Sequence, residues 1–210
     1  MGQGQSAILK RMSRDEKIAR PLGGLLVVLA VLCLLTQLAH SQGINSFMER
    51  RVELGFRLFR TLLSADQDLD KRVDSGGYLP LYLLYRDESE DAQRFGEGLR
   101  RQSAVLRGIP VRVEVVSLDE LLVGARPVPA GLYLGQPLFK RELRGLVEYG
   151  VANGVVVFSP FEGDVEKGAL AGVAVESRVR PYINDTTLKR SGIRIKSFFL
   201  RVAKHYDETR

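Results

Sequence analysis

Beyond residue 43 the hydrophobic pattern of the chain changes repeatedly between helical and strand-like spacing. Over residues 44–63 apolar side chains recur every three to four positions, which predicts an amphipathic helix. Its aromatic stripe, Phe56 and Phe59, is more typical of a core-facing surface than of a partner-binding face. We expect four arginines to lie off the apolar face: Arg50, Arg51, Arg57 and Arg60.

The next hundred residues repeat a strand–helix order. Apolar or alternating runs over 78–86, 109–117, 130–137 and 155–160 predict four strands. The stretches between them predict helices over 88–108, ending at Gly108, over 118–125, and over 137–154, starting at Pro137 and ending at Gly154. This order predicts a single compact α/β domain with flanking helices and a mostly parallel sheet of four to six strands joined by right-handed crossovers.

The C-terminal forty residues depart from that order. Residues 170–183 predict one long strand or two short ones, and Asn184 or Asp185 is a candidate N-cap. Residues 197–206 predict a terminal helix whose inward positions are Phe199, Val202, Ala203 and Tyr206.

Three basic residues of this tail, Arg194, Lys196 and Arg201, would then lie on its outer face. They form the candidate partner-binding surface of the chain. A membrane-binding surface is the alternative, because Phe198 and Phe199 lie beside these charges.

The N-terminal segment has the pattern of an export signal. A basic stretch precedes an apolar run, and Ala39 and Ser41 occupy the small-residue positions of a cleavage site before Gln42. Residues 1–41 are therefore expected to be a signal peptide or an N-terminal membrane anchor through Leu22–Leu38, and residues 42–210 the exported domain. Cys33 lies inside the apolar run, so the exported domain has no disulfide.

Charge distribution argues against nucleic acid as a partner. The formal net charge is +6, but the basic leader holds half of that excess. The remaining 26 basic and 23 acidic residues give the exported domain no general attraction for a polyanion.

Candidate chemistry is sparse. The two histidines, His40 and His205, have no partners at metal-ligand spacing, and no phosphate-loop, dinucleotide or nucleophile-elbow motif occurs. Four aspartates, Asp66, Asp68, Asp70 and Asp74, could suggest a calcium loop, but they lack its glycine and bidentate glutamate, and a solvated loop fits better. We therefore expect no enzyme, no cofactor and no metal site.

A small-ligand site remains an alternative. In a parallel sheet it would lie at the carboxyl ends of the strands, where Ser117, Gln136 and Ser159 are expected. Ser159 is the strongest candidate there, although a serine before Pro160 is more often a turn residue.

The tail resembles the YfiR/HmsC-like family of small bacterial periplasmic proteins. The resemblance covers about residues 155–203 and is carried by "VVVFSP", "GALAGVAVES", "VRPYIND" and "TTLKRSGIRIKSFFLRVA". It implies a non-enzymatic periplasmic regulator that binds an inner-membrane protein, with a diguanylate cyclase as the expected partner, and so links cyclic-di-GMP output and biofilm behaviour to the envelope. Known members carry disulfide cysteines that this domain lacks, so redox control is not expected to transfer.

Three functions therefore stay open at this point. The first is the periplasmic regulator. The second is a membrane-anchored structural subunit of an envelope complex, and the third is a small-ligand-binding α/β domain. A second copy of the chain is a further candidate partner.

Overall fold

The computed structural model describes residues 47–87 and 90–207. The predicted leader, residues 1–41, lies outside this described part. The description below concerns the compact unit Met48–Arg210.

A mixed sheet of eight strands, counted over the described residues, forms the centre of the domain. Its order is β2-β3-β1-β4-β5-β6-β7-β8. The strands are β1 (Leu79–Tyr85), β2 (Val105–Leu106), β3 (Ile109–Ser117), β4 (Gly131–Leu134), β5 (Val156–Ser159), β6 (Ala171–Val175), β7 (Val179–Asn184) and β8 (Lys204–Tyr206). The pairs β2–β3 and β6–β7 are antiparallel and the other five are parallel. The predicted α/β class with a mostly parallel sheet is confirmed, but the predicted four to six strands are too few.

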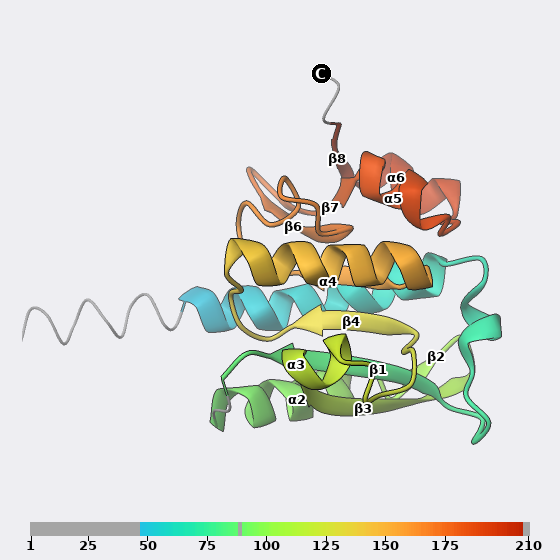
Figure 1. Cartoon of the computed structure of the whole chain (residues 1–210). Helices are drawn as coiled ribbons and strands as arrows, with labels where there is room; N and C mark the ends of the chain where they lie inside the picture. Colours follow the sequence, from blue (N-terminus) through green and yellow to red (C-terminus); the bar gives the residue numbers. More distant parts are fainter. Residues whose placement is uncertain (1–46, 88–89, 208–210) are drawn as a thin grey trace, which may run out of the picture. The chain divides into compact units, whose positions relative to one another are not determined.

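Helices cover both faces of the sheet. The first helix (residues 47–65) and α2 (Glu90–Gln102) lie on one face, where Phe59 approaches Gly131 and Val115 approaches Gly96. The opposite face carries α3 (Leu118–Leu122) and α4 (Lys140–Asn153). Figure 1 shows α3 and α4 in front of the strands and the first helix behind them. The domain is therefore a three-layer α/β structure.

The C-terminal tail extends the same sheet with β6, β7 and β8 and adds two short helices. The elements η1 (Leu69–Arg72), α5 (Asp185–Ser191) and α6 (Ser197–Val202) complete the described helices. Asn184 is the N-cap of α5, because its side chain accepts from Thr187 N at 2.8 Å. The tail reaches back to the first helix, where Lys196 N donates to Ala65 O at 2.9 Å.

Aromatic packing fixes the first helix on the sheet. Phe56, Phe59, Tyr133 and Phe158 are fully buried, and the Tyr133 and Phe158 rings stack with centroids 5.4 Å apart. The Tyr133 hydroxyl donates to Val52 O at 2.6 Å, and a Cβ at Gly55 would lie 2.2 Å from that hydroxyl. A glycine is required at position 55, because a side chain there would displace the tyrosine. The aromatic stripe therefore belongs to the core, as its spacing predicts.

Two predicted helices end earlier than expected. The helix predicted over 88–108 ends at Gln102, and a two-residue turn at Arg107 and Gly108, both with positive φ, joins β2 to β3. Positive φ at both central residues is the hairpin turn that suits the twist of the strands. The terminal helix predicted over 197–206 ends at Val202 and is followed by β8.

Candidate functional site

The strand order creates one topological switch point. Along the chain the sheet grows from β1 to β3 on one side and then from β1 to β4 on the other. Ligand sites of open α/β sheets lie where the carboxyl ends of such strands diverge. The three candidates predicted for a small-ligand site all lie at this edge: Ser117 ends β3, Ser159 ends β5, and Gln136 follows β4.

At the switch point Gln136 makes internal contacts. Its Oε1 accepts from Arg86 N and Asp87 N, each at 3.1 Å, and its Nε2 donates to Asp87 O at 3.0 Å. The carboxamide therefore ties the end of β1 to the β4–α4 connection. Next to it, the Arg86 guanidinium lies 4.4 Å from the centroid of the exposed Phe139 ring. The same guanidinium also forms an ion pair with the exposed Asp87 carboxylate.

Ser159 is a buried turn residue. Its hydroxyl donates to Asp164 Oδ2 at 2.7 Å and accepts from Phe161 N at 3.2 Å. Asp164 is also buried and receives Lys167 Nζ at 3.4 Å. Ser117 has a similar local task, since it caps α3 by accepting from Glu120 N at 3.2 Å. Both serines thus hold loops in place.

Arg51 is a buried polar residue that the sequence pattern misplaces. It was expected off the apolar face of the first helix, but it is only 9% exposed. Its guanidinium donates to Pro160 O and, at 2.8 Å, to Val173 O. Arg51 therefore joins the first helix to β5 and β6. A helical pattern alone cannot locate such a residue, because only the carbonyls of distant strands make its burial tolerable.

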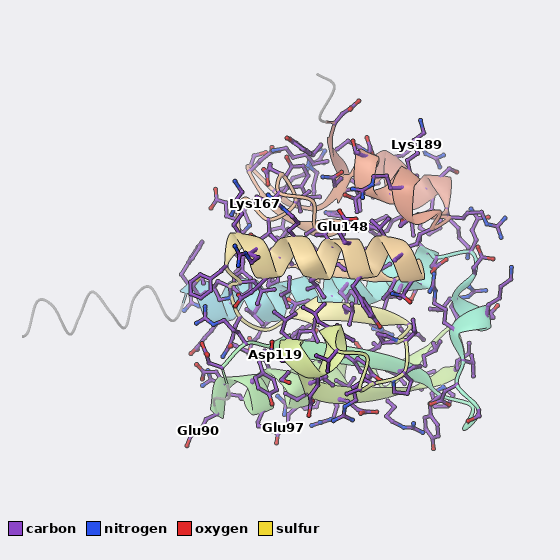
Figure 2. The ribbon with its side chains drawn as sticks, viewed as in Figure 1. Glu90, Glu97, Asp119, Glu148, Lys167 and Lys189 are labelled. Carbon is purple, nitrogen blue, oxygen red and sulfur yellow. The ribbon has the colours of Figure 1, made fainter. Side chains whose placement is uncertain are left out.

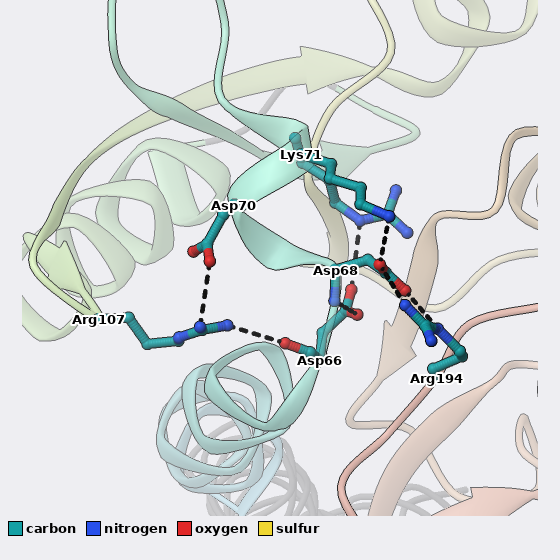
Figure 3. Close-up of polar contacts among 7 residues, drawn as sticks. Asp66, Asp68, Asp70, Lys71, Arg107 and Arg194 are labelled. Carbon is teal, nitrogen blue, oxygen red and sulfur yellow. Dashed lines mark hydrogen bonds and ion pairs between the residues drawn. The ribbon is translucent and has the colours of Figure 1, made fainter.

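The aspartate-rich segment after the first helix is largely solvent-accessible, as predicted, but one of its carboxylates is buried and the others form a network of ion pairs. Asp66 is fully buried, and its carboxylate accepts from Asp68 N at 2.9 Å and from Arg72 Nε at 3.2 Å. Asp70 pairs with Arg107 at 3.1 Å (Figure 3). Over the described residues there is no group of three side chains suited to a metal ion.

Arg194 of the tail closes this network. It contacts Asp68 with two nitrogens, Nε to Oδ2 at 2.8 Å and Nη2 to Oδ1 at 2.6 Å (Figure 3). Hydrogen bonds from Arg194, and next from Lys71, hold the pKa of Asp68 well below its usual range. The charge of Arg194 is thus largely compensated within the domain.

The other two predicted surface residues remain available. Lys196 is half-buried and has no ion pair among the described residues, and exposed Arg201 contacts only Ser197 Oγ, at 3.4 Å. On α6, Phe198 is 52% and Val202 58% exposed, whereas Phe199 is 2% exposed. The prediction that Phe199 faces inward is confirmed and that for Val202 is wrong. We call Lys196, Phe198, Arg201 and Val202 the α6 surface.

A search of the described residues for membrane-spanning helices and two comparisons of the chain with known proteins found no match. No helix in residues 47–87 and 90–207 has the length and apolar character needed to cross a bilayer. No protein-family model and no curated protein matches the chain.

Several solved structures align with part of the chain. A substrate binding protein with adhesive properties from Clostridium difficile, in its ligand-free open form, aligns with 67% of this chain at 15% identity and a TM-score of 0.48. A conserved domain protein from Vibrio cholerae gives the same coverage and identity with a TM-score of 0.46. The ABC domain from Streptococcus pneumonia in complex with L-Trp aligns with 68% at 14% identity and 0.43. The chain spans only 58–61% of the length of these proteins.

Proposed function

We propose that this chain is a non-enzymatic extracytoplasmic binding domain that regulates an inner-membrane protein. The α6 surface is the observation that carries the proposal. It places two large exposed apolar side chains, Phe198 and Val202, beside the cations Lys196 and Arg201. Aromatic residues and arginine are the types most enriched at the centres of protein interfaces.

The contacts that hold α6 in place make its surface rigid, as a binding site requires. Phe199 anchors the helix in the core, the preceding segment is held by the ion pair of Arg194 with Asp68, and the following residues pair as β8 with β7. A rigid surface loses little conformational entropy when a partner binds. The tail's resemblance to the YfiR/HmsC-like family supports a membrane-bound diguanylate cyclase as that partner and the periplasm as the compartment.

The proposal is tested in the bacterium that carries the gene. Deleting the gene should raise the cellular concentration of cyclic-di-GMP, and expressing the wild-type chain should return it to the original level. A chain with Phe198→Ser and Arg201→Glu should fold and accumulate normally, but the cyclic-di-GMP concentration should stay high. The matched control carries Val123→Ser and Lys189→Glu, which change one exposed apolar and one exposed basic residue elsewhere.

Two outcomes would count against the regulator. Unchanged cyclic-di-GMP after deletion would remove the cyclase as the partner and favour the anchored structural subunit. Full restoration by the Phe198→Ser/Arg201→Glu chain would show that the α6 surface is not the docking site.

Binding of a small ligand at the switch point is the second candidate function. The strand order and the exposed Arg86–Phe139 pair at that edge favour it. Native mass spectrometry of the chain purified from its own envelope should then reveal a bound small molecule that Arg86→Ala releases. A ligand-free spectrum, with cyclic-di-GMP still dependent on α6, would leave only the first function.

A further inference from the structure

A groove on the outer side of the helical layer has not been assigned any role so far. It lies between the first helix and α2, is open to solvent, and has a volume of about 700 Å³. The lining residues are Arg57, Arg60, Thr61, Ser64, Arg101 and Gln102. We call it the arginine groove.

The geometry of the two helices explains why these residues meet. Glu49 of the first helix pairs with Arg94 of α2 at 2.8 Å, and a Cβ at Gly98 would lie 3.1 Å from the Phe56 ring. The helices therefore run side by side in the same direction. On the first helix Arg57, Arg60 and Thr61, and Ser64 follow one another at helical spacing on one face, next to the last turn of α2.

The three arginines of the groove lie close together and have no counter-ion among the described residues. No carboxylate lines the groove, and none of its three arginines forms an ion pair with a described residue. Some arginines elsewhere are paired, as Arg107 is with Asp70 and Arg190 with Glu148. The groove thus concentrates three positive charges without compensation.

Local acids do not neutralise these charges. Glu53 and Glu97 precede Arg57 and Arg101 by one helical turn, which is the spacing at which opposite charges normally pair. Neither pair forms in the structure, and Figure 2 shows Glu97 pointing away from the body of the domain. The C-terminal ends of the helices favour nearby cations, but that effect alone does not require a lined cavity.

Acceptor atoms complement the cations. The Oε1 atom of Gln102 is buried and has no hydrogen-bond partner. The hydroxyls of Thr61 and Ser64 donate to Arg57 O at 2.7 Å and Arg60 O at 2.9 Å, which leaves their oxygens free to accept. The Gln102 oxygen has almost no solvent-accessible surface, so the two hydroxyl oxygens are the acceptors that a ligand in the groove would meet.

These donors and acceptors define a ligand class. Arginine forks recognise phosphate with paired charge-assisted hydrogen bonds. A phosphate ester carries about −1.5 to −2 charges at neutral pH, which three guanidinium groups can balance. The hydroxyl oxygens of Thr61 and Ser64 can accept hydrogen bonds from hydroxyl groups on the same molecule. We propose that the arginine groove binds a phosphate ester that carries hydroxyl groups, of the glycerol-phosphate type.

Binding is measured with the full chain in zwitterionic detergent at low salt, using glycerol 1-phosphate as the probe in calorimetry. The variant Arg57→Gln/Arg60→Gln/Arg101→Gln should bind at least tenfold more weakly, because each guanidinium lost removes charge-assisted hydrogen bonds. The matched control Arg141→Gln/Arg144→Gln/Arg178→Gln removes the same charge from exposed sites outside the groove and should bind like the wild type. Both variants should keep the wild-type melting temperature.

A second experiment, with lipid vesicles, distinguishes a soluble phosphate ester from a lipid headgroup. The chain is tested on vesicles of phosphatidylglycerol mixed with phosphatidylcholine, and on phosphatidylcholine alone. Groove-dependent binding of free glycerol 1-phosphate assigns a soluble ligand. Groove-dependent preference for phosphatidylglycerol without binding of the free ester assigns a lipid headgroup.

The inference is overturned if neither probe depends on the groove, or if the control triple variant loses as much binding as the groove variant. Thr61→Val/Ser64→Ala adds a further check: it should weaken glycerol 1-phosphate more than inorganic phosphate. Equal loss for both would contradict the role of the hydroxyl. The cyclic-di-GMP assay of α6 does not use this groove, so the two proposals fail independently.

Discussion

Removing the Phe199 side chain tests whether the tail closes the core. Phe199 is 2% exposed and belongs to the main cluster of buried apolar residues. Truncation of a buried phenylalanine to alanine costs about 3–5 kcal/mol through lost transfer free energy and the cavity left behind. Against a total stability of about 5–15 kcal/mol this is a large share. For a domain of this size it corresponds to a fall in melting temperature of about 6–20 °C.

Val202→Ala is the matched control for Phe199→Ala. Val202 lies on the same short helix but is 58% exposed, so its truncation should change the free energy of unfolding by no more than about 0.5 kcal/mol. Urea unfolding followed by circular dichroism measures both variants. If Phe199→Ala were as stable as the wild type and only weakened partner binding, the tail would be a docking element and not the closing piece of the core.

Two further perturbations examine buried and partly buried polar groups. Arg51→Met should destabilise the domain by about 2–4 kcal/mol in urea unfolding, because Pro160 O and Val173 O lose their donor; unchanged stability would mean that the cost of burying the charge cancels these bonds. Burial disfavours the charged form of His205, but hydrogen bonds to Asp185 and to Leu200 O outweigh it and raise the pKa above the ordinary 6.5. Since the folded pKa exceeds the unfolded one, this stabilisation is complete below about pH 6.5 and is lost as pH rises through the folded pKa. The urea midpoint should therefore fall more steeply from pH 6 to 8 in the wild type than in His205→Gln, and parallel profiles would contradict this assignment.

Local periodicity was sufficient for the long elements. The first helix and β3 each extend over enough residues for the 3.6- or 2-residue pattern to be visible, and the all-apolar β5 has the composition of a central parallel strand. Gly154, which ends α4 with φ of 60°, was also predictable, because a left-handed residue at a helix end favours glycine. The α/β class follows from the order of these elements along the chain.

The short strands could not be predicted in the same way. β2 has two residues and β8 has three, which is too few to show an alternating pattern. Each exists because a neighbouring strand, β3 or β7, supplies hydrogen-bond partners. The sequence pattern therefore extended the terminal helix to residue 206 and placed Val202 on its inward side, whereas α6 ends at Val202, which is exposed.

Side-chain roles depended most on tertiary structure. Arg194 was visible as a basic tail residue, but its partner Asp68 lies 126 positions earlier. The arginine groove joins residues 57–64 to residues 101–102, which only the packing of the first helix against α2 brings together. Sequence determined which side chains carry charge and which segments bury apolar surface. Tertiary structure decided which charges are neutralised, because Coulomb attraction and hydrogen bonding act over a few ångströms of space and take no account of distance along the chain.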